Sequence, residues 1–288
     1  MTSAVPVLRT LEALRAQVAA WRTAGETIAL VPTMGALHEG HLALVRLARQ
    51  SCRHVVVSIF VNPTQFAPHE DFSRYPRDEA GDLAKLAGVG CDAVWSPDRA
   101  LMYPDTFATR VVPSGAADGL ESDTRPHFFG GVATVCCKLF MQVQPDAAVF
   151  GEKDYQQLCV IRQMVRDLDL PLRIVAAPTV RAPDGLALSS RNAYLTPQQR
   201  ATAPLLHRAL TEVADAVRGG GSHGEATSAA RLALRRAGFD PIDYVEVRDA
   251  GTLAPPAAGA GRPLRVLAAA WLGKTRLIDN IGVDAKPT

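Results

Sequence analysis

Apolar runs rich in β-branched residues alternate with amphipathic runs along the first two thirds of the chain, and this alternation restricts the fold more than any other feature. The apolar run at 28–31 ends at Pro32, the amphipathic run "HLALVRLARQSC" follows, and "HVVVSIFVN" then shows no helical periodicity. A strand, a helix and a second buried strand in this order form a βαβ unit, whose strands are parallel and whose crossover is right-handed.

The same pattern continues to about residue 180. Helices are expected near 77–86, 132–143 and 156–168, and strands near 92–96, 147–150 and 172–180. An alternation of this kind predicts an α/β fold with a doubly wound parallel sheet, which binds its ligands at the carboxyl ends of the strands.

The pattern changes after the last of these strands. Helical segments at 196–217 and 224–238 are joined by the glycine-rich "RGGGSHG", which we expect to be a flexible connection, and strands follow at 243–249 and 264–272. We therefore expect a larger domain at 1–178 and a smaller α+β domain at 179–288.

Composition argues against several classes of protein. A chain of 288 residues with 48% hydrophobic residues and a net charge of +2 is typical of a globular protein and not of a general nucleic-acid binder. Its five cysteines lack CxxC spacing, which favours reduced thiols over disulfides or structural zinc. The N-terminus does not resemble a signal peptide, and no apolar run has the roughly 20 residues of a membrane span. We therefore expect a cytoplasmic protein without a nucleic-acid or membrane partner.

Two histidines stand where the first of these strands passes into a helix. His38 and His41 belong to "PTMGALHEGH", in which Gly35 and Gly40 let a ligand approach the backbone. The unpaired amides and dipole of a helix N-terminus favour phosphate, and imidazoles can donate hydrogen bonds to it. Zinc is disfavoured, because zincin helices space their histidines four residues apart. A surface turn with two exposed histidines is the plainer alternative.

Three further polar clusters follow expected strands or the expected domain boundary. Lys153 offers a cation for phosphate, and Asp154 a carboxylate that can orient it or approach a metal. Gln65 can both donate to and accept from a small hydroxy acid or amine, and Arg191, beside two serines, can bind phosphate oxygens. Each cluster taken alone is also explained as a solvated turn or loop. The polar stretch 67–82 is either a lid or a long surface loop.

These clusters, in this order, resemble the pantoate–β-alanine ligase family, the pantothenate synthetases. The matching segments are "PTMGALHEGHLALV", "SIFVNPTQF", "EDFSRYPR", "QPDAAVFGEKDYQQL", "PTVRAPDGLALSSRN", "DYVEVRD" and "TRLIDNI". The resemblance covers the chain almost end to end and implies a Rossmann-like nucleotidyltransferase domain, a smaller C-terminal domain and a homodimer. It also implies the ATP-dependent joining of (R)-pantoate to β-alanine through a pantoyl adenylate, with Mg²⁺ accompanying ATP.

The resemblance assigns roles to individual residues. His41 matches the family's proton donor, Gln65 matches a residue that touches pantoate and β-alanine, and Gln157 matches a second pantoate contact. His38, Lys153 and Arg191 are further candidates for stabilising negative charge on the phosphates. The expected ATP contacts are Pro32, Thr33, Met34, Gly35, Ala36, Leu37, His38, Glu39, Gly40, His41, Gly151, Glu152, Lys153, Asp154, Val180, Leu188, Ser189, Ser190 and Arg191. No metal ligand is assigned.

One segment departs from the family pattern. The family usually reads R-P-G-H-F-x-G-V, whereas this chain has "RPHFFGGV" at 125–132, so Phe128 stands where the histidine would be. Two other functions fit parts of the sequence. A nucleotidyltransferase that leaves the nucleotide on its product fits the HxGH signature alone, and a regulatory module fits nucleotide binding without catalysis.

Overall fold

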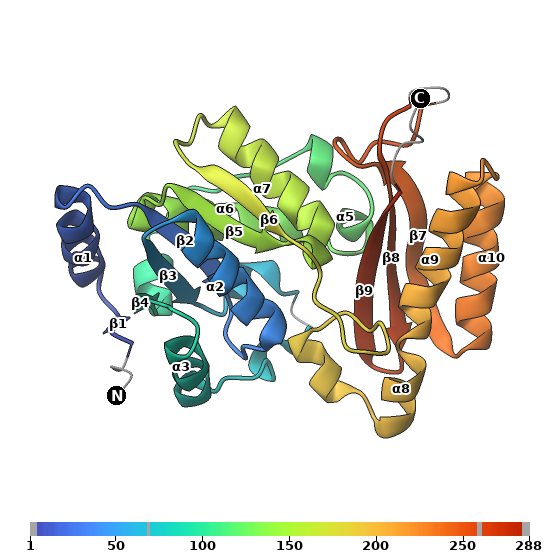
Figure 1. Ribbon diagram of the computed structural model, residues 1–288, viewed down its shortest axis with the longest axis horizontal. Helices are drawn as coiled ribbons and strands as arrows, with labels where there is room; N and C mark the ends of the chain where they lie inside the picture. Colours follow the sequence, from blue (N-terminus) through green and yellow to red (C-terminus); the bar gives the residue numbers. More distant parts are fainter. Residues whose placement is uncertain (1–4, 68–69, 258–260, 284–288) are drawn as a thin grey trace.

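The computed structural model describes residues 5–67, 70–257 and 261–283 (Figure 1). Its larger sheet has six strands, all parallel, in the order β1-β4-β3-β2-β5-β6. In that order the strands are Val7–Leu8, Ala93–Trp95, His54–Ile59, Ile28–Thr33, Ala147–Gly151 and Arg173–Ala177. The doubly wound α/β prediction is confirmed. The connections reverse direction between β2 and β5, so a crevice opens beyond the carboxyl ends of these two strands.

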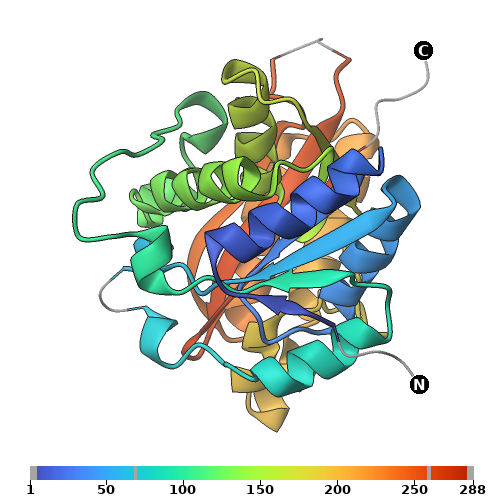
Figure 2. The same cartoon turned by 90° about the vertical axis from the view of Figure 1, so that its left-hand side faces the viewer.

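Helices cover both faces of the parallel sheet (Figure 2). One face packs against α1, α6 and α7, and the other against α2 and α3. These helices are α1 Leu11–Thr23, α6 Phe128–Val143, α7 Tyr155–Asp167, α2 Glu39–Ser51 and α3 Glu79–Ala87, and the short α4 Arg99–Met102 and α5 Glu121–Thr124 lie in the connections. Leu30 of β2 enters one core while Ala29 and Val31 enter the other, which explains why this strand is apolar throughout.

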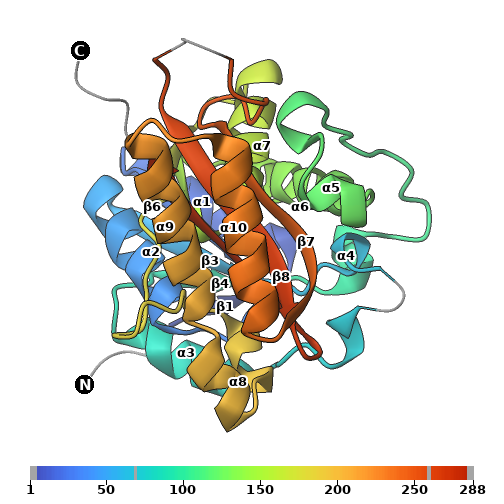
Figure 3. The ribbon, with the colours of Figure 1, turned by 90° about the vertical axis from the view of Figure 1, so that its right-hand side faces the viewer.

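The C-terminal part has a different architecture. An antiparallel sheet of β7 Phe239–Asp249, β8 Leu264–Leu272 and β9 Thr275–Val283 is covered on its outer face by α9 Leu205–Arg218 and α10 His223–Arg236 (Figure 3). The opposite face contributes Tyr244, Leu267 and Ala269 to the core that contains α6 and α7. The two sheets therefore share a packed boundary. This layout confirms the smaller α+β unit, while the exact boundary at 178/179 stays a prediction.

Several elements differ from the sequence-based expectations. The helical segment expected at 196–217 is two helices, α8 Pro197–Thr202 and α9, because Pro204 lacks a backbone N–H and interrupts the hydrogen-bond ladder. The segment expected to be flexible is a tight turn, in which the amides of Gly219, Gly220 and Gly221 donate to carbonyls of the last turn of α9. The strands β1 and β9 and the helix α1 were not predicted. No helix within the described residues is long and apolar enough to cross a membrane.

Candidate active site

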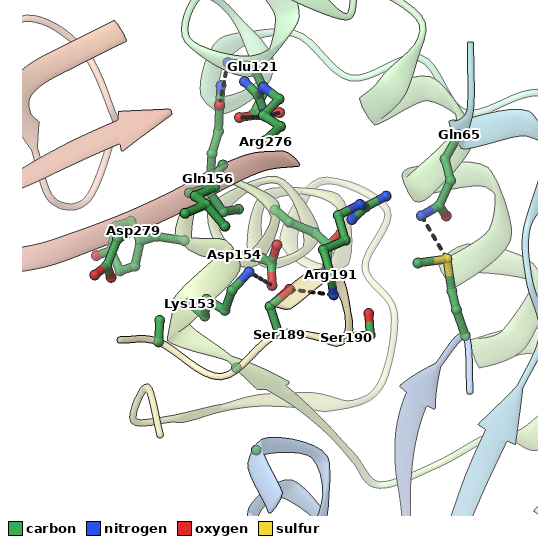
Figure 4. Close-up of a pocket in the computed structure, with 18 of the residues that line it drawn as sticks. Gln65, Glu121, Lys153, Asp154, Gln156, Ser189, Ser190, Arg191, Arg276 and Asp279 are labelled. Atoms are coloured by element: carbon green, nitrogen blue, oxygen red, sulfur yellow. Dashed lines mark hydrogen bonds and ion pairs between the residues drawn. The ribbon is translucent and has the colours of Figure 1, made fainter. Parts of the chain in front are cut away.

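A cavity of about 520 Å³ lies beyond the carboxyl ends of β2 and β5 and extends to β8 and β9. Its walls come from the β2–α2 loop, the turn after β3, the β5–α7 turn, the segment 178–194 and the β8–β9 hairpin. Lys153 and Asp154 line it together with Ser189, Ser190 and Arg191 (Figure 4). A volume of this order is typical of a site for a small organic ligand.

The two histidines of the β2–α2 loop cap the helix that they begin. His38 is the N-cap residue of α2, and its Nδ1 accepts a hydrogen bond from the amide of Gly40 at 3.1 Å. The Nδ1 of His41 accepts from the amide of His38 at 3.3 Å, which completes a capping box made of two imidazoles. A ring nitrogen that accepts carries no proton, so each neutral ring has its proton on Nε2. Both residues line the cavity, and Nε2–H is the donor that each ring has left for a ligand.

Burial keeps both imidazoles neutral. Desolvation, with a smaller contribution from the charge of Lys153, lowers the pKa of His38 to about 4. Desolvation, followed by repulsion from His38 and Lys153, lowers the pKa of His41 to about 3. The ring centroids are 4.1 Å apart, so protonating both rings places two positive charges in contact. At neutral pH the pair therefore offers hydrogen-bond donors and no net charge.

This geometry changes the expected use of the helix N-terminus. The amides of His38 and Gly40, which the sequence suggested as phosphate donors, already donate to imidazole nitrogens. The two rings accept hydrogen bonds from these amides, and each ring offers its Nε2–H group to the cavity instead. Hydrogen bonds from imidazole thus replace part of the expected backbone cradle.

The turn between β5 and α7 places the positively charged Lys153 on the cavity wall. The Lys153 ammonium is 3.8 Å from the Asp154 carboxylate, and its side chain is 20% exposed. A residue of β9 holds this turn in place. The side-chain amide of Asn280 donates to the backbone carbonyls of Glu152 at 2.9 Å and Lys153 at 2.8 Å. Glu152 itself faces Arg265 of β8 at 3.1 Å. The C-terminal sheet therefore orients the lysine, although it lies more than a hundred residues away in the sequence.

The loop that carries Arg191 is folded back as a narrow hairpin. The amide of Leu188 donates to the carbonyl of Val180 at 2.9 Å, and the hydroxyl of Ser189 accepts from the amide of Arg191 at 3.3 Å. The hydroxyl of Ser190 lies 3.2 Å from that of Tyr75, and the Arg191 guanidinium lies 5.9 Å from the centre of the Tyr75 ring. Arg191 therefore lines the cavity next to the polar stretch that the sequence suggested as a lid.

Two predicted glutamines lie on the cavity wall in different surroundings. Gln65 accepts from Asn62 at 3.0 Å and directs its amide nitrogen to the sulfur of Met34 at 3.2 Å (Figure 4). Gln157 lines the cavity at the start of α7. Its neighbour Gln156 is 3% exposed and bonds to backbone groups of Ala116, Gly119 and Glu121. Gln157 is thus placed to bind a ligand, whereas Gln156 holds the loops together.

Sixteen of the predicted site residues line the cavity. They are Pro32, Thr33, Met34, His38, Gly40, His41, Gln65, Gly151, Lys153, Asp154, Gln157, Val180, Leu188, Ser189, Ser190 and Arg191. The structure does not bring Gly35, Ala36, Leu37, Glu39 and Glu152 to the wall. Leu37 is in the core, Glu39 pairs with Arg46 and Glu152 pairs with Arg265. Contact between ATP and these five residues stays a prediction.

Sequence reasoning missed a network of charges at the far end of the cavity. Arg276 of β9 pairs with Glu121 at 2.8 Å and with Asp243 at 2.7 Å (Figure 4). Tyr244 donates to Glu121 at 2.7 Å, and burial raises its pKa well above the usual value. The resemblance covered Asp243, Tyr244 and Arg276 through "DYVEVRD" and "TRLIDNI", but no pattern pointed to Glu121, whose partners Tyr244 and Arg276 lie more than a hundred residues away in the sequence.

The segment that departs from the family pattern also reaches the cavity. Phe128 lines it, with the Arg125 guanidinium 3.9 Å above the ring centre. Arg125 binds both oxygens of Glu70 at 2.7 Å and donates to the carbonyl of Gln65 at 3.1 Å. The neighbouring His127 is exposed. An aromatic ring therefore contacts a guanidinium beside Gln65, at the position where the resemblance implies a histidine.

Comparisons with known proteins agree with one another. The family model described as pantoate-beta-alanine ligase matches residues 6–282. The pantothenate synthetase of Paramagnetospirillum magneticum is 58% identical, with 99% of this chain and 100% of that protein covered. The one from Caulobacter vibrioides is 56% identical, covering 98% and 100%.

Solved structures give the same result. The crystal structure of pantothenate synthetase from Thermus thermophilus superposes with a TM-score of 0.90 at 47% identity, covering 97% of this chain and 100% of that one. The pantoate-beta-alanine ligase from Francisella tularensis, complexed with beta-gamma ATP and beta-alanine, superposes with a TM-score of 0.81 at 32% identity, covering 96% and 97%.

Proposed function

The chain belongs to the pantoate-beta-alanine ligase family, and from that premise we propose that it condenses (R)-pantoate with β-alanine at the expense of ATP. The products are pantothenate, AMP and pyrophosphate, and the intermediate is an enzyme-bound pantoyl adenylate. One observation carries the proposal: two neutral imidazole donors, two cations and two glutamines converge on a single cavity. The relative from Francisella tularensis, solved with beta-gamma ATP and beta-alanine, supports the choice of nucleotide and amine.

In the first step a carboxylate oxygen of pantoate attacks the α-phosphorus of ATP. A new P–O bond forms, the bond from phosphorus to the bridging oxygen breaks, and pyrophosphate leaves. Negative charge accumulates on the phosphate oxygens, so fixed donors in a partly desolvated cavity lower the barrier. Lys153 and Arg191 supply positive charge, and His38 and His41 supply Nε2–H donors.

The geometry around His41 supports a role other than the proton donor that the resemblance implies. A neutral imidazole whose Nδ1 accepts from the backbone stabilises a phosphate oxygen by hydrogen bonding and does not act as a cationic acid. A bound triphosphate adds negative charge beside the ring and raises the pKa of His41 from its value in the free protein. We therefore propose that His41 and His38 share one task, stabilising charge on the phosphates.

In the second step the amine of β-alanine attacks the acyl carbon of the adenylate. The C–N bond forms, the C–O bond to AMP breaks, and the nitrogen releases one proton to water. Gln65 and Gln157 offer amide groups to the hydroxyls and carboxylate of the acid, and Phe60, Val132 and Leu139 provide apolar walls for its methyl groups. Enclosure protects the anhydride from water until the amine arrives.

Magnesium fits the site as a companion of ATP. It binds through one or two carboxylates together with the phosphates of a nucleotide. Among the carboxylates that line the cavity, Glu70, Glu121, Asp243 and Asp279 pair with arginines, whereas Asp154 is 47% exposed and lies near the Lys153 ammonium. Asp154 would hold the ion, which neutralises phosphate charge when bound. A homodimer and a cytoplasmic location are further parts of the proposal.

Product analysis tests this function. Purified protein with ATP, Mg²⁺, (R)-pantoate and β-alanine should yield equal amounts of pantothenate and AMP, and omission of β-alanine should leave a single turnover of pyrophosphate release. A stable adenylylated product, with no AMP, would instead identify a nucleotidyltransferase. ATP binding without any turnover would identify a regulatory module.

A further inference from the structure

Helix α3 contacts the histidine loop although no expected ligand-binding residue lies on it. Asp82 of α3 is 1% exposed, and its carboxylate oxygens accept hydrogen bonds from the amides of Ala36 at 2.8 Å and Leu37 at 2.7 Å. Lys85, one turn later, donates to the carbonyl of Leu37 at 2.8 Å and lies 3.8 Å from the Asp82 carboxylate. Three backbone groups of two consecutive loop residues are thus bound by two side chains of one helix.

These contacts meet the loop where its backbone is least favourable. Ala36 has a φ of 50°, in the left-handed region that residues with a side chain rarely occupy. Gly35 has a φ of 84°, and a Cβ at this position would lie 3.1 Å from the Asp82 carboxylate. Strained conformations of this kind persist only where the surroundings fix them. The carboxylate of Asp82 supplies that constraint, directly before the N-cap His38.

The same part of the chain also reaches the second phosphate-binding loop. The stretch that leads into α3 contains Tyr75, whose hydroxyl lies 3.2 Å from that of Ser190, and Arg74, whose carbonyl accepts from Tyr194 at 3.3 Å. Residues 74–85 therefore contact the histidine loop at one end and the 189–194 segment at the other. The histidine loop follows β2 and the 189–194 segment follows β6, two strands that β5 separates in the sheet, so the spacing of the two loops depends on what lies between them.

We propose that Asp82, supported by Lys85, is a positioning residue that holds the left-handed turn at Ala36 and thereby aims the His38 and His41 donors toward the Ser189–Arg191 loop. The role in catalysis rests on the proposed function, whereas the role in loop order does not. Asp82 acts through the backbone of residues 36 and 37, whose amides it occupies, so substrate contact is not required of it.

The substitution Asp82→Asn tests this role. The carboxamide oxygen can accept one of the two amides, but its NH₂ group faces the other donor, so the turn at Ala36 loses a hydrogen bond. We expect amide hydrogen exchange at Ala36 and Leu37 to accelerate at least about tenfold, while the β2 and β5 amides keep their protection. We also expect kcat for pyrophosphate release to fall about 10- to 100-fold, with a much smaller change in the KM for (R)-pantoate.

Asp78→Asn is the matched control. Asp78 caps the same helix by accepting from the amide of Gly81 at 3.0 Å, and it does not contact the histidine loop. The substitution removes the same charge from the same helix and keeps the cap, because asparagine is as good an N-cap residue as aspartate, so exchange at Ala36 and Leu37 and the catalytic rate should stay near wild type. Lys85→Met is a second probe that keeps the carboxylate, and it should shift both readouts in the same direction by a smaller factor.

The exchange and kinetic results separate the two ideas. The wild-type protein could make no pantothenate while Asp82→Asn alone accelerates exchange at Ala36 and Leu37. That result would keep the positioning role and remove the proposed reaction. Wild-type exchange at both amides in Asp82→Asn and Lys85→Met would overturn the positioning role even if the ligase reaction is observed. Equal acceleration in Asp78→Asn would show that loss of a negative charge on α3, and not loss of the hydrogen bonds from Asp82 to the loop, causes the effect, which also contradicts the proposal.

Discussion

Replacing His41 by asparagine separates its hydrogen-bonding role from its ionisation. The side-chain oxygen of asparagine can take the position of Nδ1 and accept from the amide of His38, so the cap at the start of α2 is kept. Asparagine does not titrate, and it lacks the Nε2–H donor that faces the cavity. The variant should therefore fold, lose much of its activity, and show a weaker dependence of stability on pH.

The size of the pH effect follows from the lowered pKa of His41. Burial holds this pKa at about 3 in the folded protein, against 6.5 in an unfolded chain. Below pH 6.5 the unfolded state binds a proton that the folded state excludes, so the stability from neutral His41 is complete above pH 6.5 and is lost as the pH falls. The loss at pH 5 is about 2 kcal/mol, and the partial exposure of the ring reduces it toward about 1 kcal/mol.

Urea unfolding at pH 8 and pH 5 measures this difference. The free energy of unfolding of the wild type should fall by about 1–2 kcal/mol more than that of His41→Asn over this range, because all other titrating groups are common to both proteins. His127→Gln, at an exposed position, serves as the control and should behave as the wild type does. Equal losses in wild type and His41→Asn would refute the neutral, buried imidazole and with it the proposed role of His41 as a neutral hydrogen-bond donor to the phosphates.

Three further predictions concern other residues of the cavity. Lys153→Met should lower kcat about 10²- to 10³-fold with little change in melting temperature. Lys138→Met, which removes the ammonium over Phe107, is the control and should keep wild-type kinetics. A comparable loss of kcat in both variants would deny Lys153 a specific role. Gln157→Ala should raise the KM for the acid about tenfold in steady-state kinetics without unfolding the protein. Gln156→Ala should lower the free energy of unfolding by about 2–3 kcal/mol in a urea titration, because backbone groups lose their partner. The reverse pattern would exchange the roles of the two glutamines. Asp279→Ala leaves Arg181 without the carboxylate that it binds at 2.6 Å and 2.8 Å, so stability should fall by about 3–5 kcal/mol in the same titration; a change below about 1 kcal/mol would show that the pair contributes little.

The meeting of the main clusters was predictable from the sequence. Parallel strands present their carboxyl ends at one edge of a sheet, so segments that follow β2, β3 and β5 must come together once the βαβ pattern is recognised. This rule alone predicts that Lys153 and Gln65 lie at the same edge of the sheet. The final strand β9 was not predicted, although its segment was among those that resembled the family, because the polar Asp279 and Asn280 stand in the middle of the strand, whereas β8 is an almost continuous apolar run.

The finer features of the site depend on contacts that no local pattern records. The histidines were expected beside free amides, but capping geometry lets their own rings bind two of those amides. Asp82 lies 45 residues from Leu37 on a helix that carries no expected ligand-binding residue, and only packing of α3 beside the loop brings them together. The Glu121–Arg276 pair joins a short helix to the last strand. A pair of this kind depends on how the two sheets pack against each other. The sequence predicted the two domains but not their packing.

Transfer of an oxygen atom tests the proposed adenylate most directly. With (R)-pantoate labelled with ¹⁸O in its carboxylate, ATP and β-alanine, mass spectrometry of the nucleotide product should find AMP carrying one ¹⁸O, because the attacking carboxylate oxygen leaves with the phosphate. Pantothenate should retain the other labelled oxygen. Unlabelled AMP, or ADP together with ¹⁸O-labelled inorganic phosphate, would contradict attack on the α-phosphorus and the account built on it.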